Sequence, residues 1–167
     1  ENFGEFQDFL ASSQYFLTSD GWRLHYIDSS SGDTSNIVLC LHALPYWSYQ
    51  FKQLLPLLKK AGFRVLMPDF LGCGLSDKPK KKKWHSVNNH VAAIHELLLA
   101  LKVTSCTIVV MGNSIEVAHA LVSFFSASTI ILYVPNDDSD IDLIKSRLAS
   151  RPIPTENTRQ VPLCFFN

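Results

Sequence analysis

Apolar residues gather along this chain in short runs, and most runs are followed by a stretch whose apolar residues recur at helical spacing. Four runs are almost wholly apolar, which predicts β-strands buried on both faces. These strands are Ile37–Leu41, Phe63–Met67, Thr107–Met111 and Thr129–Val134. A chain that alternates strand and helix in this way builds a parallel sheet with helices on both faces. The pattern therefore predicts a three-layer α/β fold with a mostly parallel sheet.

A β-hairpin is predicted ahead of these four strands. Gln14–Leu17 and Trp22–Asp28 flank an Asp20-Gly21 pair, and Asp-Gly is a strong signal for a tight turn between antiparallel strands. Residues 1–13 place phenylalanines at helical spacing, so we expect a short helix before the hairpin.

The helical stretches carry recognisable start and stop signals. Tyr49–Lys60 contains Pro56, which should kink or split the helix, and Gly62 suits the end of that helix. Ser86 is the predicted N-cap of a helix that runs to Leu101. A further helix, Ile115–Phe125, follows the third buried strand.

The segment after the fourth strand is less regular. Pro135–Asp142 is an acidic loop, in which Ser139 and Asp142 resemble a capping box for a short helix to Ser150. Residues 151–167 hold three prolines and no clear period. We accordingly divide the chain into an N-terminal helical extension (1–13), a partial α/β domain (14–150) and an irregular tail (151–167).

The composition fits a globular protein, with 47% hydrophobic and 18% charged residues. Fifteen basic and fifteen acidic residues cancel, so no overall attraction to nucleic acid or to a membrane is expected. We interpret Lys80–Lys83 as a solvated loop rather than a phosphate site. No apolar run is long enough to span a bilayer. The chain begins at Glu1 without a leader, and we expect it to be a fragment or a processed product.

Metal and redox chemistry are not indicated by the sequence. The four cysteines are scattered and form no C-x-x-C pair, so we expect buried free thiols, which favour an intracellular protein. These cysteines are Cys40, Cys73, Cys106 and Cys164. His90 and His95 share one predicted helix but lack a third ligand at metal spacing, and we interpret them as helix-surface histidines. We predict no metal and no cofactor.

The candidate chemistry centres on the turn between the third buried strand and the helix that follows it. Gly112–Glu116 reads G-N-S-I-E, which is G-x-S-x-G with the last glycine replaced by glutamate. In this motif a strand turns sharply into a helix, and the serine sits exposed on the turn. The helix N-terminus stabilises negative charge there. Ser114 is therefore the candidate nucleophile, and we expect Glu116 to crowd the turn.

Polar or glycine-rich loops follow all four buried strands. They are His42–Pro45, Asp69–Gly74, the segment around Ser114, and Asn136–Asp138. Sites in parallel sheets form beyond the carboxyl ends of the strands. We therefore expect these loops to meet at one rim of the sheet.

Three of these segments resemble the α/β-hydrolase superfamily. H-A-L-P at residues 42–45 is similar to the family's H-G-x-P turn, and P-D-F-L-G-C-G-L-S-D-K-P at residues 68–79 is similar to the loop after the next strand. G-N-S-I-E at residues 112–116 falls at the nucleophile elbow. The first two are most like the branch of haloalkane dehalogenases, epoxide hydrolases and mesoderm-specific transcript-like proteins. The resemblance covers about residues 14–135 and implies a truncated α/β-hydrolase fold.

The resemblance also implies roles for individual residues. The backbone N–H groups of Leu44 and Ile115 would form an oxyanion hole beside Ser114. Asp137 or Asp138 would supply the acid of a triad, the alternative being that this acidic pair is a solvated loop. His42 belongs to the oxyanion turn, where its expected role is structural. The matched motif positions are His42, Ala43, Pro45, Asp69, Gly72, Gly74, Gly112, Asn113 and Glu116.

The sequence departs from that branch at positions that matter for catalysis. Ser114 stands where an aspartate is usual, and Ile115 stands where the dehalogenases have a tryptophan. Ala43 replaces the glycine of the oxyanion turn. The family places its catalytic histidine after the last strand of a longer sheet, with a cap domain before it, and no segment here matches either.

Three hypotheses follow. The chain is the N-terminal part of a hydrolase that acts on a small ester, epoxide or haloalkane, or it is an inactive pseudoenzyme or binding protein of the same fold. The third, an unrelated doubly wound nucleotide binder, is weakly supported, because Gly72 and Gly74 are followed by no third glycine and no P-loop lysine is present. We expect this chain by itself to have little or no activity, no nucleic-acid partner and an exposed sheet edge at the fourth buried strand.

Overall fold

The computed structural model of the chain describes residues 3–29, 36–124, 126–132, 146 and 163–164. Asp137 and nearly all of the predicted helix up to Ser150 lie outside the described residues. None of the helices in the described ranges is long and apolar enough to cross a membrane.

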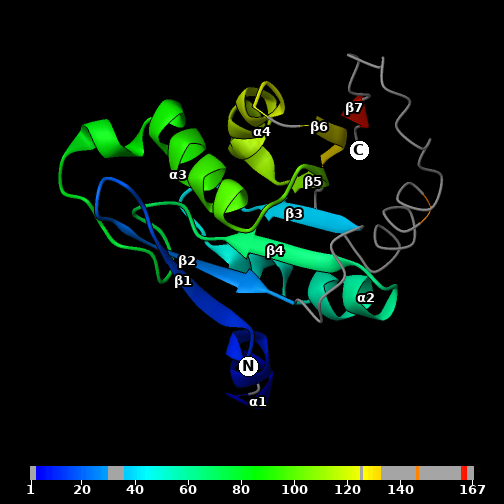
Figure 1. Cartoon of the computed structure of the whole chain (residues 1–167). Coiled ribbons are helices and arrows are strands. Elements are labelled where there is room, and N and C mark those ends of the chain that lie inside the picture. Colours follow the sequence, from blue (N-terminus) through cyan, green and yellow to red (C-terminus); the bar gives the residue numbers. More distant parts are fainter. Residues whose placement is uncertain (1–2, 30–35, 125, 133–145, 147–162, 165–167) are drawn as a thin grey trace.

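The described strands form a seven-stranded sheet in the order β1-β2-β4-β3-β5-β6-β7 (Figure 1). The hairpin strands β1 and β2 are antiparallel, and β2 also pairs antiparallel with β4. From β4 onward all neighbours are parallel, so the predicted parallel arrangement and the predicted hairpin are both confirmed. The strands are β1 (Ser13–Leu17), β2 (Arg23–Asp28), β3 (Ile37–Leu41), β4 (Arg64–Pro68), β5 (Ser105–Val110), β6 (Ser126–Leu132) and β7 (Leu163–Cys164).

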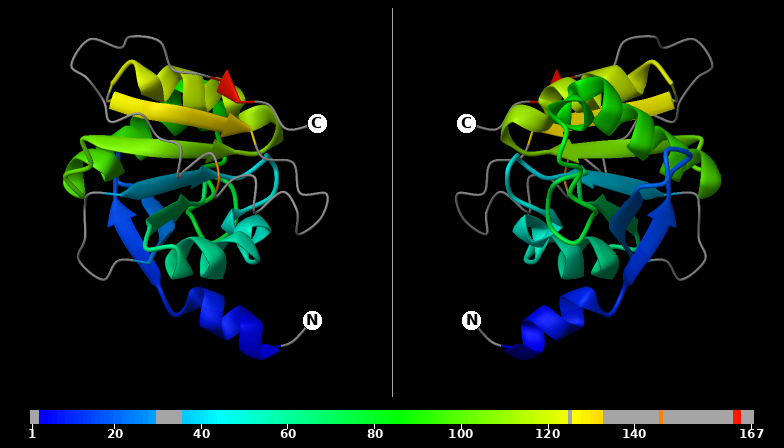
Figure 2. Two further views of the ribbon diagram at one scale, coloured as in Figure 1. Left: turned by 90° about the vertical axis from the view of Figure 1, so that its right-hand side faces the viewer. Right: turned by 90° about the vertical axis from the view of Figure 1, so that its left-hand side faces the viewer.

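Helices cover both faces of the sheet (Figure 2). Successive residues of a strand point to opposite faces, so a strand buried on both sides feeds two cores. In β3, Leu39 and Leu41 join the core under α3 and α4, whereas Val38 and Cys40 join the core under α1 and α2. The helices are α1 (Phe3–Leu10), α2 (Leu54–Lys60), α3 (Val87–Ala100) and α4 (Ile115–Val122), with 3₁₀ turns η1 (Ser48–Phe51), η2 (Lys82–His85) and η3 (Gly112–Ser114). The three-layer prediction is confirmed.

The helix ends follow the signals in the sequence. The predicted helix Tyr49–Lys60 is split into η1 and α2, and Pro56 lies in the first turn of α2, where its missing N–H would have no partner within the helix. Gly62 ends that helix with a φ of +85°. The Ser86 hydroxyl accepts a hydrogen bond from the Asn89 N–H at the start of α3, as an N-cap should.

The C-terminal segment differs from the prediction of an irregular tail. Leu163–Cys164 forms the short strand β7, which pairs in parallel with Ile130 and Ile131 of β6. The expectation that the fourth buried strand ends the sheet is therefore wrong at these two positions. Residues 161–166 read V-P-L-C-F-F, a short apolar stretch with no period that would mark a two-residue strand. The hydrogen bonds of β7 come from a distant partner, β6.

Candidate active site

The predicted elbow forms where β5 meets α4. Ser114 closes the 3₁₀ turn η3 and immediately precedes Ile115, the first residue of the helix. Gly112 has a φ of +54° in this turn. A Cβ at Gly112 would lie 3.1 Å from the Cβ of Ala43, so the elbow and the His42–Pro45 turn pack closely. The predicted position of Ser114, between strand and helix and beside that turn, is confirmed.

Two hydrogen bonds join the elbow to the turn that follows β3. The Ser114 hydroxyl donates to the carbonyl oxygen of His42 at 2.5 Å, and the Leu44 N–H donates to Oδ1 of Asn113 at 2.9 Å. Ser114, Asn113 and Leu44 are therefore brought together as the sequence indicates. The N–H of Leu44, predicted as an oxyanion donor, already has an acceptor in the Asn113 side chain.

Ser114 is fully buried, whereas the motif predicts an exposed hydroxyl. Its φ of −78° and ψ of 1° lie in the bridge region between helical and extended backbone, and the left-handed conformation of this turn falls on Gly112. The Ser114 hydroxyl points to the backbone carbonyl of His42 and not outward. A serine that donates to a carbonyl is not deprotonated by that partner.

His42 holds the loops after β3 and β4 together. Its Nε2 accepts a hydrogen bond from the Phe70 N–H at 3.0 Å, which leaves the proton on Nδ1 to donate to the Ala43 carbonyl at 3.0 Å. Burial lowers the pKa of His42, although its bond to Ala43 and the charge of Asp69 act in the opposite direction. Both ring nitrogens are hydrogen-bonded to backbone groups, so the geometry matches the structural role expected for His42.

Asp69 is the centre of the loop after β4. Its buried carboxylate accepts from the Ser48 N–H at 2.8 Å and from the Leu75 N–H at 2.9 Å, and it is bonded to Nδ1 of His25 at 2.8 Å. Burial by itself would raise the pKa of Asp69, but the hydrogen bonds from His25, Leu75 and Ser48 hold it below its ordinary value. Gly74 lies against this carboxylate with a φ of +47°.

The sequence interpretation missed Asp69's partners. His25 lies 44 positions before Asp69, on the predicted hairpin, and no motif spacing links the two. A histidine in an otherwise apolar strand was the one signal available, because a buried polar side chain needs a partner.

The structure contradicts the prediction that His90 lies on the helix surface. It is buried against the Phe70 ring, with centroids 4.9 Å apart, and its Nδ1 has no hydrogen-bond partner. Burial, together with His85 and His42, lowers its pKa to about 4. The surface prediction failed because position 90 shares the inner face of α3 with Ile94 and Leu97. His95 is half-buried and packs on Phe124.

No histidine ring in the described ranges is hydrogen-bonded to Ser114, whose hydroxyl donates to the backbone carbonyl of His42. The acid candidate Asp137 lies outside the described residues. Within the same ranges no group of three or more His, Cys, Asp or Glu side chains is placed to hold a metal ion. Cys40, Cys73 and Cys106 are buried, as predicted, and Cys40 and Cys73 are free thiols.

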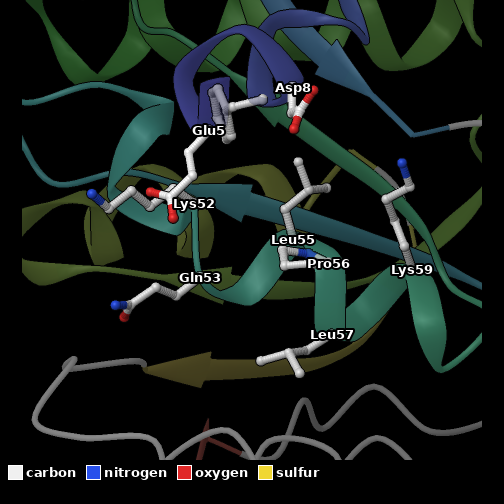
Figure 3. A pocket seen from close by; sticks show the side chains of 9 residues that line it. Glu5, Asp8, Lys52, Gln53, Leu55, Pro56, Leu57 and Lys59 are labelled. Carbon is white, nitrogen blue, oxygen red and sulfur yellow. The ribbon is translucent and has the colours of Figure 1, made fainter. Parts of the chain in front are cut away.

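One cavity of about 730 Å³ lies between α1 and α2 (Figure 3). Glu5 and Asp8 of α1 line it on one side, and Lys52, Leu55 and Lys59 line it on the other. None of the residues predicted for the catalytic site contributes to this cavity. It is therefore separate from the rim at which Ser114 lies.

Glu116 does not crowd the elbow. It is exposed in the first turn of α4, where a negative charge interacts favourably with the helix dipole. The expectation that this residue distorts the turn is wrong, because the tight conformation is taken by Gly112 and position 116 is already helical.

Glu116→Gly is therefore expected to destabilise the protein by about 1 kcal/mol, the cost of glycine within a helix. Urea unfolding measures the change, and Glu116→Ala is the matched control because alanine keeps the helix propensity. A gain in stability in both variants would show instead that the glutamate is under strain.

Comparison with known proteins decides the family. A family model described as the alpha/beta hydrolase fold matches residues 36–115, which contain the turn after β3, the Asp69 loop and the elbow. The chain is a member of the α/β-hydrolase superfamily. Its mixed sheet, the hairpin at its start and the helices on both faces are those of the α/β-hydrolase fold.

Curated and solved relatives agree with this assignment. A haloalkane dehalogenase of Mycobacterium marinum is 39% identical over 88 residues, covering 53% of this chain and 29% of the relative. A haloalkane dehalogenase structure from Paraglaciecola agarilytica superposes with a TM-score of 0.67 at 22% identity, over 90% of this chain and 56% of that one. An epoxide hydrolase structure from Vigna radiata superposes with a TM-score of 0.64 at 20% identity, over 76% of this chain and 40% of that one. The aligned region thus spans under a third of the M. marinum haloalkane dehalogenase.

Proposed function

We propose that this α/β-hydrolase chain supplies the nucleophile and oxyanion-hole part of a hydrolase for small esters, epoxides or haloalkanes. Ser114 is the nucleophile in this proposal, and the N–H groups of Leu44 and Ile115 are the oxyanion donors. The observation that supports it is the direct contact between the turn after β3 and the elbow after β5, through Ser114 to His42 and Leu44 to Asn113. The dehalogenase and epoxide hydrolase relatives supply the substrate classes.

The geometry sets two conditions for this chemistry. The Ser114 hydroxyl must rotate from the His42 carbonyl toward a base, since serine attacks only when a base takes its proton. The Asn113 oxygen must also leave the Leu44 N–H before that donor can stabilise an oxyanion. Each oxyanion donor in a serine hydrolase contributes about 3 kcal/mol to lowering the barrier. All six histidines of the chain are among the described residues, and none is bonded to Ser114 through its ring. We therefore propose a base that this chain does not supply and keep Asp137 as the proposed acid.

The alternative proposal is an inactive member of the superfamily that binds a ligand or partner without turning it over. The same contacts favour it. The Ser114 hydroxyl is buried and donates to a carbonyl, and the Leu44 N–H already donates to Asn113. In this arrangement neither group is available to a substrate. Under this proposal the elbow contributes to stability and not to catalysis.

Turnover of an ester, an epoxide and a haloalkane separates the two proposals. We expect the 167-residue chain to show little or no turnover by itself, because its serine has no base partner. The product of the longest native reading frame should turn over at least one substrate under the hydrolase proposal. Removing a serine nucleophile costs on the order of 10⁶ in kcat, so Ser114→Ala in that product should be inactive.

Ser123→Ala is the matched control, since Ser123 is an exposed serine at the end of α4. If the longest product is inactive on every substrate, the binding-protein proposal holds. Robust turnover by the 167-residue chain that disappears in Ser114→Ala would contradict our expectation that it lacks a base.

A further inference from the structure

A second serine in this protein lies in a continuous row with a histidine and an aspartate. The Ser13 hydroxyl is 3.0 Å from Nε2 of His25, and Nδ1 of His25 is 2.8 Å from Oδ2 of Asp69. The three side chains come from β1, β2 and the loop after β4, which are neighbours in the sheet. Ser114 is not part of this row, and β2, β4 and β3 separate the strand of Ser13, β1, from β5, which leads to Ser114 (Figure 1).

The donors and acceptors of the row can be assigned from the surrounding bonds. Asp69 also accepts from two backbone N–H groups, at Ser48 and Leu75, and an ionised carboxylate is an acceptor only. His25 must therefore carry its proton on Nδ1 and donate it to Asp69. This leaves the Nε2 lone pair facing the Ser13 hydroxyl, which donates to it. A base in that tautomer, oriented by a buried carboxylate, is the arrangement that activates serine in hydrolases.

The row is held rigidly at its inner end. The His25 N–H donates to the Ser76 hydroxyl at 2.8 Å, and that hydroxyl in turn donates to the Asp69 carbonyl at 2.6 Å. These two hydrogen bonds fix β2 to the loop after β4, and His25 is fully buried. Groups fixed in this way need no reorganisation when charge develops.

The outer end of the row is accessible. β1 is the outermost strand of the described sheet, and Ser13 is only half-buried on it. Tyr15 packs on the His25 ring with centroids 5.3 Å apart and is 50% exposed. The Arg23 guanidinium lies 5.0 Å from the centre of the Tyr15 ring, although Arg23 itself pairs with Leu17, four residues along β1 from Ser13. An electrophile can approach Ser13 from the open edge of β1.

We propose that Ser13 is a second nucleophile, with His25 as its general base and Asp69 as the orienting carboxylate, for activated acyl and phosphonyl esters. In the acyl reaction a bond forms between Ser13 Oγ and the carbonyl carbon, and the Ser13 proton passes to Nε2 of His25. The bond to the leaving aryloxide then breaks, and that oxygen takes the proton from His25. Water releases the acyl group by the reverse route and restores the Ser13 hydroxyl. This reaction is independent of Ser114 and of the proposed function.

A fluorophosphonate probe tests the proposal on the purified chain. The Ser13 oxygen would bond to phosphorus as fluoride leaves, and peptide mass spectrometry would locate the adduct on Ser13. We expect labelling to fall by about 10² or more in Ser13→Ala, the lower range for a positioned general base and nucleophile. Ser12→Ala is the matched control, because Ser12 is the adjacent half-buried serine, and it should label like the wild type. No adduct on Ser13 in the wild-type chain would overturn the proposal.

Two single-cysteine substitutions, at positions 13 and 12, provide a measurement that does not depend on the fluorophosphonate probe. A thiol at position 13 would face His25, and a neighbouring imidazolium lowers the pKa of a thiol. Ser13→Cys should therefore react with iodoacetamide at pH 6 about tenfold faster than Ser12→Cys, while both variants keep the wild-type circular dichroism. Equal alkylation rates would show that His25 and Asp69 form a structural bond only.

Discussion

Asp69→Asn is expected to lower the free energy of unfolding by about 3–5 kcal/mol, because it removes a buried carboxylate that accepts three hydrogen bonds. Three donors converge on this carboxylate, from Ser48, Leu75 and His25. A carboxamide has the same shape but offers a single acceptor oxygen, so its NH₂ group must face at least one of these donors. A buried donor left without an acceptor loses its full desolvation energy.

Urea unfolding followed by tryptophan fluorescence measures this loss. Asp77→Asn is the matched control, because Asp77 belongs to the same loop and accepts from the Arg23 N–H but is only half-buried. Its loss should be on the order of 1 kcal/mol, as for a typical hydrogen bond. Similar losses in the two variants would mean that the buried network contributes nothing beyond an exposed one.

The pH dependence of stability provides a second readout for Asp69. Its pKa is lower in the folded protein than the value of about 3.9 for an unfolded aspartate. The carboxylate therefore stabilises the fold above pH ~3.9, and that contribution disappears as the pH falls through the folded pKa. Asp69→Asn should remove this part of the acid-induced loss. A variant with the same loss of stability below pH 4 as the wild type would rule out Asp69 as its source.

Gly74→Ala is expected to be the second severe substitution, with a loss of at least about 3 kcal/mol, as for overpacking combined with a strained backbone. A Cβ at position 74 would lie 2.1 Å from Oδ2 of Asp69 and 2.8 Å from the Cβ of Trp47. Gly74 also has a φ of +47°, which other residues rarely adopt. The carboxylate cannot move away without losing its three donors.

Gly62→Ala separates the backbone contribution from the clash. Gly62 has a φ of +85°, and a Cβ there would meet nothing within 4 Å. It should lose only about 1 kcal/mol, the cost of a left-handed alanine. Thermal unfolding of both variants measures the difference, and equal losses would contradict a contact between Gly74 and the Asp69 carboxylate.

Most of the fold could be predicted from the sequence because its signals are local. Apolar runs without alternation indicated the buried strands, and Asp20-Gly21 indicated the hairpin. Pro56 and Ser86 fixed the starts of α2 and α3 through rules that involve only a few neighbouring residues. The two-residue strand β7 was missed because pairing with β6 alone defines it.

The candidate site was predicted in position but not in chemistry. The motifs placed Ser114 beside the turn after β3, and the structure brings them together. They did not indicate that its hydroxyl would be buried on a carbonyl, or that Asn113 would occupy the Leu44 N–H. His90 was assigned to the helix surface because no third ligand at metal spacing gave it another role, whereas its position on α3 faces the core.

The sequence by itself determined the α/β alternation, the hairpin and the order in which the three α/β-hydrolase turns follow β3, β4 and β5. These depend on side-chain periodicity and on glycine and proline, which act over a few residues. Only the tertiary structure decided that β4 lies between β2 and β3. That order places His25 of the hairpin against Asp69, because hydrogen-bonded strands lie about 4.8 Å apart whatever their separation along the chain. The register of the hairpin itself places Ser13 beside His25.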